Sequence, residues 1–574
     1  MLDHVITGGT IVDGTGAPAY TGDVGIRDGR VVAIGQVDEE AQSSYDATGM
    51  VVAPGFIDNH THYDAQLFWD PMLTPSNIHG VTTVLGGNCG FTLAPLRPAD
   101  ADYTRRMMAR VEGMPLEALE TGVRWTWQSF AEYLDAVEAN GLALNAGFLV
   151  GHCALRRYVM GEDAVGNEAS DDQLKELVAQ LHEAIDAGGL GFSTTLSSTH
   201  SDGDGKPVAS RAASKEELLA LCAAVGEHEG TFLEGIVPGC LDKFSDDEIE
   251  LLAGMSAAAR RPLNWNILTI DAREPDRIPR QLEASKRARE LGGRVIALTM
   301  PVLVPMNMSF GTFCGLWLIP GWNEVLNRPV PERIAQLRDP AVREEMMRRA
   351  NSKEAGVFKR LASFGRYVIG DTYSPENEGL KGRVVGDIAK ERGVDAFAAL
   401  AEIVANDDCR TVLWPMPDDN DPDTWALRAQ AWDEEDVLLG GSDAGAHLDR
   451  MAGAPFTTRF LGDMLRGRKL MSLERAVHMI TGVQADAFGL TDRGYLREGA
   501  YADIVVFDPE TVAAEAATLL HDLPGGAPRL TADAIGVRRV LVNGVEVVRD
   551  GVPTGATPGT VLRSGRDTHT VATS

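Results

Sequence analysis

The stretch GFIDNHTHYD, residues 55–64, places His60 and His62 two positions apart at the end of a short apolar run. Side chains two apart in a β-strand point to the same side. Imidazole is the commonest metal ligand in proteins, so this spacing allows both rings to bind one ion. Asp58 is a nearby carboxylate that could orient one ring. For an isolated pair, two histidines that cap a turn remain the alternative.

Outward from this stretch, apolar runs of strand length alternate with helical patterns. The alternation predicts a parallel sheet of the α/β class, and eight runs predict a TIM-like (β/α)8 barrel over residues 55–485. Amphipathic stretches at 170–188 and 214–230 each begin with Ser and end with Gly, as helices often do. A further apolar run, at 410–416, is one more than the eight strands of such a barrel. The eight expected strands cover residues 55–60, 81–88, 144–152, 189–195, 231–237, 262–268, 294–300 and 436–443.

Both ends of the chain contain short alternating runs separated by Asp-Gly and Asn-Gly pairs, which favour tight hairpins. Residues 1–54 and 486–560 each hold too few strands to bury a sheet face alone, so we expect one small β-sandwich built from both. The polar residues 561–574 are expected to be disordered. The irregular segments 93–127 and 301–329 are expected to be lids, because loops of this length usually have a function.

Composition and charge restrict the partners. The chain has 53 Lys and Arg against 83 Asp and Glu, a net charge of −30, which argues against nucleic acid or anionic membranes. No apolar run is long enough for a transmembrane helix, and the N-terminus lacks the features of a signal peptide. The six scattered cysteines form no disulfide framework and fit a reducing compartment. We therefore expect a cytoplasmic protein with a small-molecule substrate; the sequence leaves homo-oligomerisation open.

Two further stretches give the histidine pair a context. HGVTTVLGGNCG (79–90) places Cys89 directly after the second strand, and LLGGSDAGAH (438–447) places Asp443 at the end of the eighth. With APGFIDNHTHYD, they resemble the amidohydrolase superfamily and, within it, the N-acyl-D-amino-acid deacylase branch. The resemblance covers the whole architecture. It implies that His60, His62 and Cys89 bind metal and that Asp443 is both a loose ligand and the general base.

Each of these residues also has an ordinary structural interpretation. Cys89 could be a buried structural cysteine and Asp443 could cap a turn. The third strand ends in LVGHCALR, which also resembles that branch and implies that His152 lines the substrate pocket; a hydrogen-bonded core histidine is the alternative. His200 and His447 follow the fourth and eighth strands. Each is a candidate substrate contact or a loop residue.

Strands five and six depart from the resemblance, which implies a histidine ligand in each. Here they read TFLEGIV and PLNWNIL, with Gly235 beside Glu234 on the former and Asn264 and Asn266 on the latter. Three alternatives follow. The site holds one metal bound by His60, His62 and Asp443, with Cys89 nearby; or Glu234 replaces a lost ligand; or the site is degenerate. A carboxylate suits zinc and also a harder ion such as manganese.

The lead hypothesis is a metal-dependent hydrolase of a carbon–nitrogen amide bond, with zinc or another divalent ion such as manganese. By resemblance, its substrate is an N-acyl-D-amino acid or a related amide. Asp443 would take a proton from the attacking water and pass it to the leaving amine. Two alternatives stay open: a cyclic-amide or lactone hydrolase or non-hydrolytic lyase on the same barrel, and a non-catalytic binding protein with a degenerate metal site. Aromatic residues in the second lid favour an apolar substrate portion or simple packing: Phe310, Phe313, Trp317 and Trp322.

Overall fold

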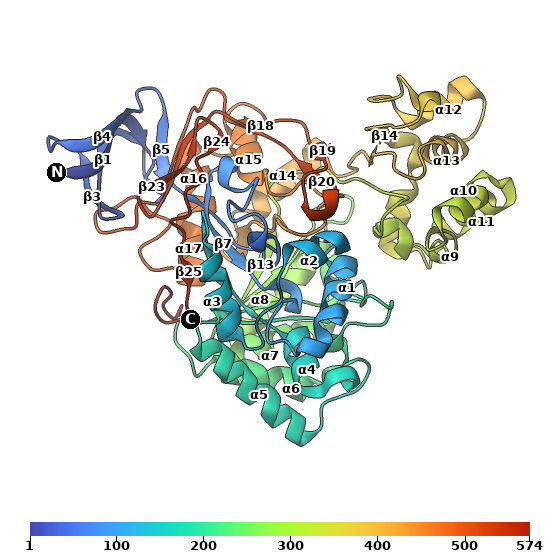
Figure 1. Ribbon diagram of the computed structural model, residues 1–574, viewed down its shortest axis with the longest axis horizontal. Helices are drawn as coiled ribbons and strands as arrows, with labels where there is room; N and C mark the ends of the chain where they lie inside the picture. The colour runs from blue at the N-terminus through green and yellow to red at the C-terminus, as the bar shows by residue number, and fades with distance from the viewer. Residues whose placement is uncertain (574) are drawn as a thin grey trace.

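The two ends of the chain form one nine-stranded sheet, seen on the left of Figure 1. The computed structural model describes residues 1–573. The strands are β1 (Leu2–Ile11), β2 (Tyr20–Arg27), β3 (Arg30–Gly35), β4 (Ala41–Asp46), β5 (Val51–Pro54), β17 (Ile504–Phe507), β22 (Val537–Val542), β23 (Val545–Arg549) and β24 (Val552–Pro553). Antiparallel pairing of β5 with β17 joins the N-terminal strands to the C-terminal ones. The pairs Asp28–Gly29 and Asn543–Gly544 have positive φ at both positions and make the expected hairpin turns.

Parallel strands form the TIM-like barrel domain. They are β6 (Phe56–Asp58), β7 (Val81–Gly86), β8 (Asn145–Phe148), β9 (Val150–Gly151), β10 (Gly191–Thr195), β11 (Phe232–Ile236), β12 (Pro262–Asn266), β13 (Arg294–Thr299) and β16 (Val437–Leu439). β9 to β13 and β16 share one parallel sheet, and β6, β7 and β8 share another. β8 and β9 are nearly continuous in the chain and together fill the third position. An isolated parallel bridge between Thr61 and Ala444 brings the segments after β6 and β16 together.

Helices cover the barrel, and serine caps fix where two of the expected ones begin. Ser170 and Gln173 form a reciprocal cap on α5 (Asp171–Asp186), and the Ser214 hydroxyl accepts the Glu217 N–H at the start of α6 (Lys215–Val225). Figure 1 shows both helices along the lower side of the barrel. The other helices around it are α3 (Phe130–Asn140), α4 (His152–Met160), α7 (Asp246–Ala259), α8 (Arg277–Glu290), α14 (Pro422–Ala431), α15 (Phe456–Leu465), α16 (Leu473–Ile480) and α17 (Gly482–Phe488).

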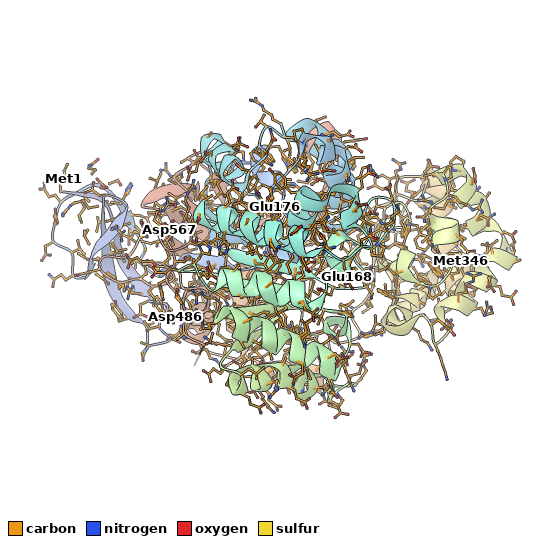
Figure 2. The ribbon with its side chains drawn as sticks, turned by 90° about the horizontal axis from the view of Figure 1, so that it is seen from below. Met1, Glu168, Glu176, Met346, Asp486 and Asp567 are labelled. Atoms are coloured by element: carbon orange, nitrogen blue, oxygen red, sulfur yellow. The ribbon has the colours of Figure 1, made fainter. Side chains whose placement is uncertain are left out.

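A helical lobe is inserted between β13 and β16 and projects from the barrel at the upper right of Figure 1. Figure 2 shows Met346 of this lobe and Met1 at opposite ends of the molecule. The lobe has its own hydrophobic core, in which Phe310, Trp317 and Trp322 are buried, so the expected lid aromatics pack inside it. Its elements are α9 (Asn323–Leu326), α10 (Val330–Arg338), α11 (Pro340–Ala350), β14 (Val368–Ile369), α12 (Val385–Arg392), α13 (Ala396–Asn406) and β15 (Leu413–Trp414). The surplus run is β15, which pairs with β14 and not with the barrel.

Two segments are more ordered than the sequence predicts. Segment 93–127, expected to be an irregular lid, contains α1 (Ala101–Val111) and α2 (Leu116–Gly122), and its role as a lid stays a prediction. The C-terminal tail is not disordered as far as residue 573: β25 (Val561–Leu562) is buried beside β8, and Thr568 hydrogen bonds to Gly230. A pair of apolar residues and well-placed hydrogen bonds hold a segment whose composition is otherwise polar. Within residues 1–573, no helix is long and apolar enough to cross a membrane.

Candidate metal centre

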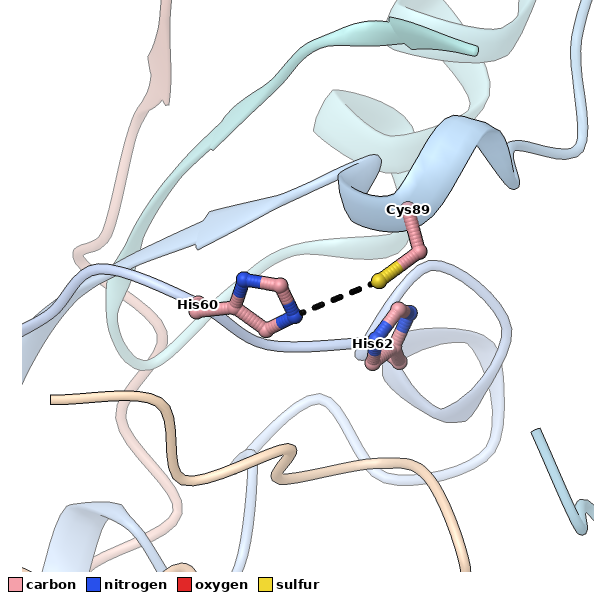
Figure 3. A group of neighbouring side chains, drawn as sticks. All are labelled: His60, His62 and Cys89. Atoms are coloured by element: carbon pink, nitrogen blue, oxygen red, sulfur yellow. Dashed lines mark hydrogen bonds between the residues drawn. The ribbon is translucent and has the colours of Figure 1, made fainter. Parts of the chain in front are cut away.

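His60 and His62 follow β6 and lie side by side in the mouth of the barrel, both fully buried (Figure 3). The backbone around them is fixed from two sides. Thr61 N–H donates to Leu85 O on β7, and His62 N–H donates to Ala444 O in the segment after β16. Because one neighbour lies on β7 and the other in the segment after β16, these two barrel segments fix the backbone that carries the two rings.

Cys89 lies on the short turn after β7 and turns its thiol toward the histidines. Its Sγ is 3.6 Å from His60 Nε2, the dashed contact in Figure 3, and 3.6 Å from Asn266 Nδ2 on β12. Cys89 has φ of +55°, a left-handed conformation held by donation of its N–H to Glu234 Oε2 at 2.7 Å. One ligand atom each from His60, His62 and Cys89 lie within 4.8 Å of one another.

Asp443 brings a carboxylate to the same place from the end of β16. Its Oδ1 lies 3.2 Å from His60 Nε2 and 3.7 Å from His62 Nε2. Burial would raise the pKa of Asp443, but the contact with His60 and the nearby His62 and His447 hold it well below its usual range. The predicted ligands His60, His62, Cys89 and Asp443 are therefore brought together.

The donor set fits a divalent ion such as zinc, which binds thiolate, imidazole and carboxylate. In a tetrahedral zinc site an imidazole nitrogen and a carboxylate oxygen lie about 3.4 Å apart, and a nitrogen and a sulfur about 3.6 Å apart. The contacts of 3.2–3.7 Å around His60 and His62 match these separations. Burial lowers the pKa of His62 to about 3, which leaves its ring neutral with a lone pair for a metal.

Strands five and six present polar groups where the expected histidines are missing. Glu234 on β11 is fully buried; its Oε2 accepts the Cys89 N–H and its Oε1 has no partner among residues 1–573. Burial raises the pKa of Glu234 to about 7. On β12, Asn264 is buried with neither side-chain polar atom hydrogen-bonded within the described chain. Glu234 therefore braces Cys89 through one carboxylate oxygen and keeps the other without a partner within residues 1–573.

His152 lies in a buried hydrogen-bonded network and not on a pocket wall. Its Nδ1 is 2.9 Å from Thr194 Oγ1 and its Nε2 is 2.8 Å from Glu217 Oε1, which also binds Arg156. Both ring nitrogens are engaged, so neither is free for a substrate. The structure corrects the expectation of a pocket histidine in favour of the core alternative.

Asp58 does not orient a histidine ring. Its Oδ2 accepts a hydrogen bond from Ser442 Oγ at 2.5 Å, and neither His60 Nδ1 nor His62 Nδ1 has a partner in the described part of the chain. Asp58 thus links the end of β6 to the segment that follows β16. It holds the two ligand-bearing segments together instead of acting on a ligand.

His200 and His447 lie at the edge of the candidate centre. His200 Nδ1 is 2.8 Å from Thr195 Oγ1, and its ring packs against Phe91 at 5.3 Å between centroids. Positive charge on either ring would lower the pKa of His62, and charge on His447 would also lower the pKa of Asp443. Both rings therefore lie near the candidate ligands. Burial lowers the pKa of His447 to about 4. Both are half-buried and stay candidates for substrate contact.

Glu112, at the C-terminal end of α1, was missed by the sequence reasoning. Its Oε2 lies 3.6 Å from His62 Nε2, and its side chain is only 4% exposed. Burial and the charges of Asp443, Asp64 and Glu234 raise the pKa of Glu112 well above its usual range. No local pattern marked this residue, because its contact with His62 spans fifty positions and depends on how α1 docks.

Comparisons with known proteins agree with the geometry. The model of the Amidohydrolase family matches residues 44–548. D-aminoacylase of Alcaligenes xylosoxydans xylosoxydans is 30% identical over 98% of this chain and 97% of its own length, and N-acyl-D-aspartate deacylase of the same organism is 32% identical over 98% and 96%. The solved N-acyl-D-glutamate deacylase of Bordetella bronchiseptica, complexed with zinc and a phosphonate mimic of the tetrahedral intermediate, is 27% identical over 98% of this chain and all of that one, with a TM-score of 0.66. The chain therefore belongs to the Amidohydrolase family, hydrolases of carbon–nitrogen bonds other than peptide bonds, and within it to the branch of the N-acyl-D-amino-acid deacylases.

Proposed function

We propose that this protein is a divalent-metal-dependent deacylase that hydrolyses the amide bond of N-acyl-D-amino acids. The observation that carries the proposal is the convergence of four side chains from three barrel segments. His60, His62 and Cys89 form one buried group, and Asp443 Oδ1 lies 3.2 Å from His60 Nε2 and 3.7 Å from His62 Nε2. The relatives named above support the substrate class by what their names say they act on. Zinc, or a harder ion such as manganese, is the expected cofactor.

In this proposal each residue has a defined task. His60, His62 and Cys89 hold the ion, which would polarise the amide carbonyl and activate water for attack. Asp443 Oδ1 accepts the proton of the attacking water and then delivers it to the leaving amine nitrogen. Asp443 has φ of +52°, and this left-handed turn directs its carboxylate back toward the histidines. Glu234 and Asn266 fix the position of the Cys89 turn.

A cavity of about 620 Å³ between the barrel and the inserted lobe suits the acyl group or side chain of such a substrate. The cavity is linked to the candidate centre through Ile267, which lines it and follows Asn266, whose Nδ2 contacts Cys89 Sγ; the candidate ligands themselves do not line the cavity. Its size is typical of a small-molecule site. Much of its wall is apolar, including Leu268, Ile270, Met300, Leu303, Met306 and Trp414.

The same wall carries positive charge that is held in place by carboxylates. Arg273 and Arg360 share Asp271, and Arg428 pairs with Asp419. An N-acyl amino acid combines an apolar acyl group with one carboxylate, which matches a cavity with both characters. The mainly apolar wall favours substrates with apolar over acidic side chains.

The test is a panel of N-acetylated amino acids incubated with zinc-loaded protein. We expect release of acetate from N-acetyl-D-leucine and N-acetyl-D-methionine, slower release from N-acetyl-D-aspartate, and none from N-acetyl-L-leucine. A Glu120→Gln variant, altered on exposed α2, should match the wild type. Protein that holds metal but hydrolyses none of the D-substrates, or that prefers the L-substrate, would contradict the proposal.

A further inference from the structure

Glu112 is a carboxylate near the histidines that comes from the end of a helix, and not from a barrel strand or the turn directly after one. It ends α1, in the segment between β7 and α3. Its Oε2 is 3.6 Å from His62 Nε2, on a ring that also lies 3.7 Å from Asp443 Oδ1. His62 is therefore flanked by two carboxylates, both beyond normal hydrogen-bond length.

Glu112 has few polar contacts within the protein. Its side chain is 4% exposed, and His62, at 3.6 Å, is its one ion-pair contact among residues 1–573. Buried carboxyl groups are normally hydrogen-bonded, paired or bound to a metal. A cation between Glu112 and His62 would supply a closer partner than the protein itself provides.

The backbone fixes Glu112 in this position. His447 N–H donates to Glu112 O, which ties the end of α1 to the loop that carries Asp443. The following residue, Gly113, has φ of +58°, and a Cβ there would lie 1.7 Å from Arg450 Nη2. The positive φ favours glycine, and a Cβ would also lie 3.1 Å from His447 Cα, so the turn after Glu112 packs closely on the loop that follows β16.

We propose that Glu112 is an additional metal ligand, which supplies one of the donors lost from strands five and six. The separation of its Oε2 from His62 Nε2, 3.6 Å, is close to the roughly 3.4 Å between an imidazole and a carboxylate on one zinc ion. The inference rests on the proposed metal centre and extends it to a residue of the α1 segment. Glu234 is the rival candidate, because its Oε2 accepts the Cys89 N–H while its Oε1 has no partner among residues 1–573.

The test measures zinc binding and not activity. Wild type, Glu112→Gln and the exposed-site control Glu120→Gln are stripped of metal, and the zinc Kd of each is determined by competition with a chromophoric chelator. Loss of an outer-shell partner alone weakens metal binding about 10- to 100-fold, so for the loss of a ligand we expect Glu112→Gln to bind zinc more than about 100-fold more weakly. Glu120→Gln should equal the wild type, and thermal melting of the stripped proteins should coincide.

The outcomes separate this inference from the proposed function. If the wild type binds zinc and Glu112→Gln binds it equally tightly, Glu112 is not a ligand. The proposed metal centre of His60, His62 and Cys89 is then unaffected. If the wild type binds neither zinc nor manganese, both proposals fail. Glu112→Asp keeps a carboxylate on a shorter side chain and should bind zinc more tightly than Glu112→Gln; this variant decides the matter if the glutamine variant does not fold.

Discussion

The buried network of His152, Arg156 and Glu217 gives a stability prediction that also tests where His152 acts. Arg156 is fully buried, and its Nη1 lies 2.5–2.6 Å from both oxygens of Glu217, which is 2% exposed. Glu217→Gln leaves the guanidinium without its counter-charge. Removing one partner of a buried ion pair costs about 3–5 kcal/mol, or two to four orders of magnitude in the unfolding equilibrium.

The pH dependence follows from the pKa of Glu217. Burial would raise this pKa, but hydrogen bonds from His152 and Arg156 and their charges lower it overall. A carboxyl with a lowered pKa in the folded state stabilises the fold above the pKa of the unfolded chain, about 4.3. This contribution is lost as the pH falls below that value through the lower folded-state pKa. The gap in stability between wild type and Glu217→Gln should therefore narrow in acid.

Urea unfolding followed by fluorescence measures the effect, with Glu216→Gln, exposed on the same helix, as the matched control. The midpoint of Glu217→Gln should fall while that of Glu216→Gln stays. The Glu217→Gln protein that remains folded should have an unchanged KM for an N-acyl-D-amino acid, because both ring nitrogens of His152 are hydrogen-bonded within the core. An unchanged midpoint together with a raised KM would refute this reasoning and indicate that His152 contacts the substrate.

Three further predictions concern the centre and the lobe. Asp443→Asn should lower kcat by about 10²- to 10⁴-fold while zinc content, measured by mass spectrometry, stays at the wild-type value; loss of the zinc would show that Asp443 is mainly a ligand. Glu234→Gln should weaken zinc binding less than Glu112→Gln in the chelator assay; the reverse order would make Glu234 the replacement ligand. Leu303→Ser, in the cavity wall, should raise KM for N-acetyl-D-leucine about tenfold, and an unchanged KM would place the substrate elsewhere.

Local patterns were sufficient to predict much of the fold. The Asp28–Gly29 and Asn543–Gly544 turns could be predicted because only a few residues adopt positive φ at both positions of a hairpin turn. Buried parallel strands are continuous apolar runs, so each barrel strand lies inside a predicted range. The inserted lobe was signalled only by the wide gap between the seventh and eighth runs, and its helices were not recognised as a separate unit.

The candidate site could be predicted only where its residues follow strands. His60, His62, Cys89 and Asp443 each come directly after a barrel strand, and the ends of parallel strands meet at one edge. Glu112 follows a helix outside the barrel and reaches the site through its contact with the loop after β16. The β25 tail was misjudged for a similar reason, since a two-residue strand beside β8 leaves no periodic signal.

The most direct test of the metal centre is anomalous diffraction at the zinc edge from crystals of the zinc-loaded protein. The proposed centre requires an anomalous peak about 2.0–2.1 Å from imidazole nitrogens of His60 and His62 and about 2.3 Å from Cys89 Sγ. A peak bound by other residues, or full zinc occupancy in solution without a peak between these three side chains, would contradict it.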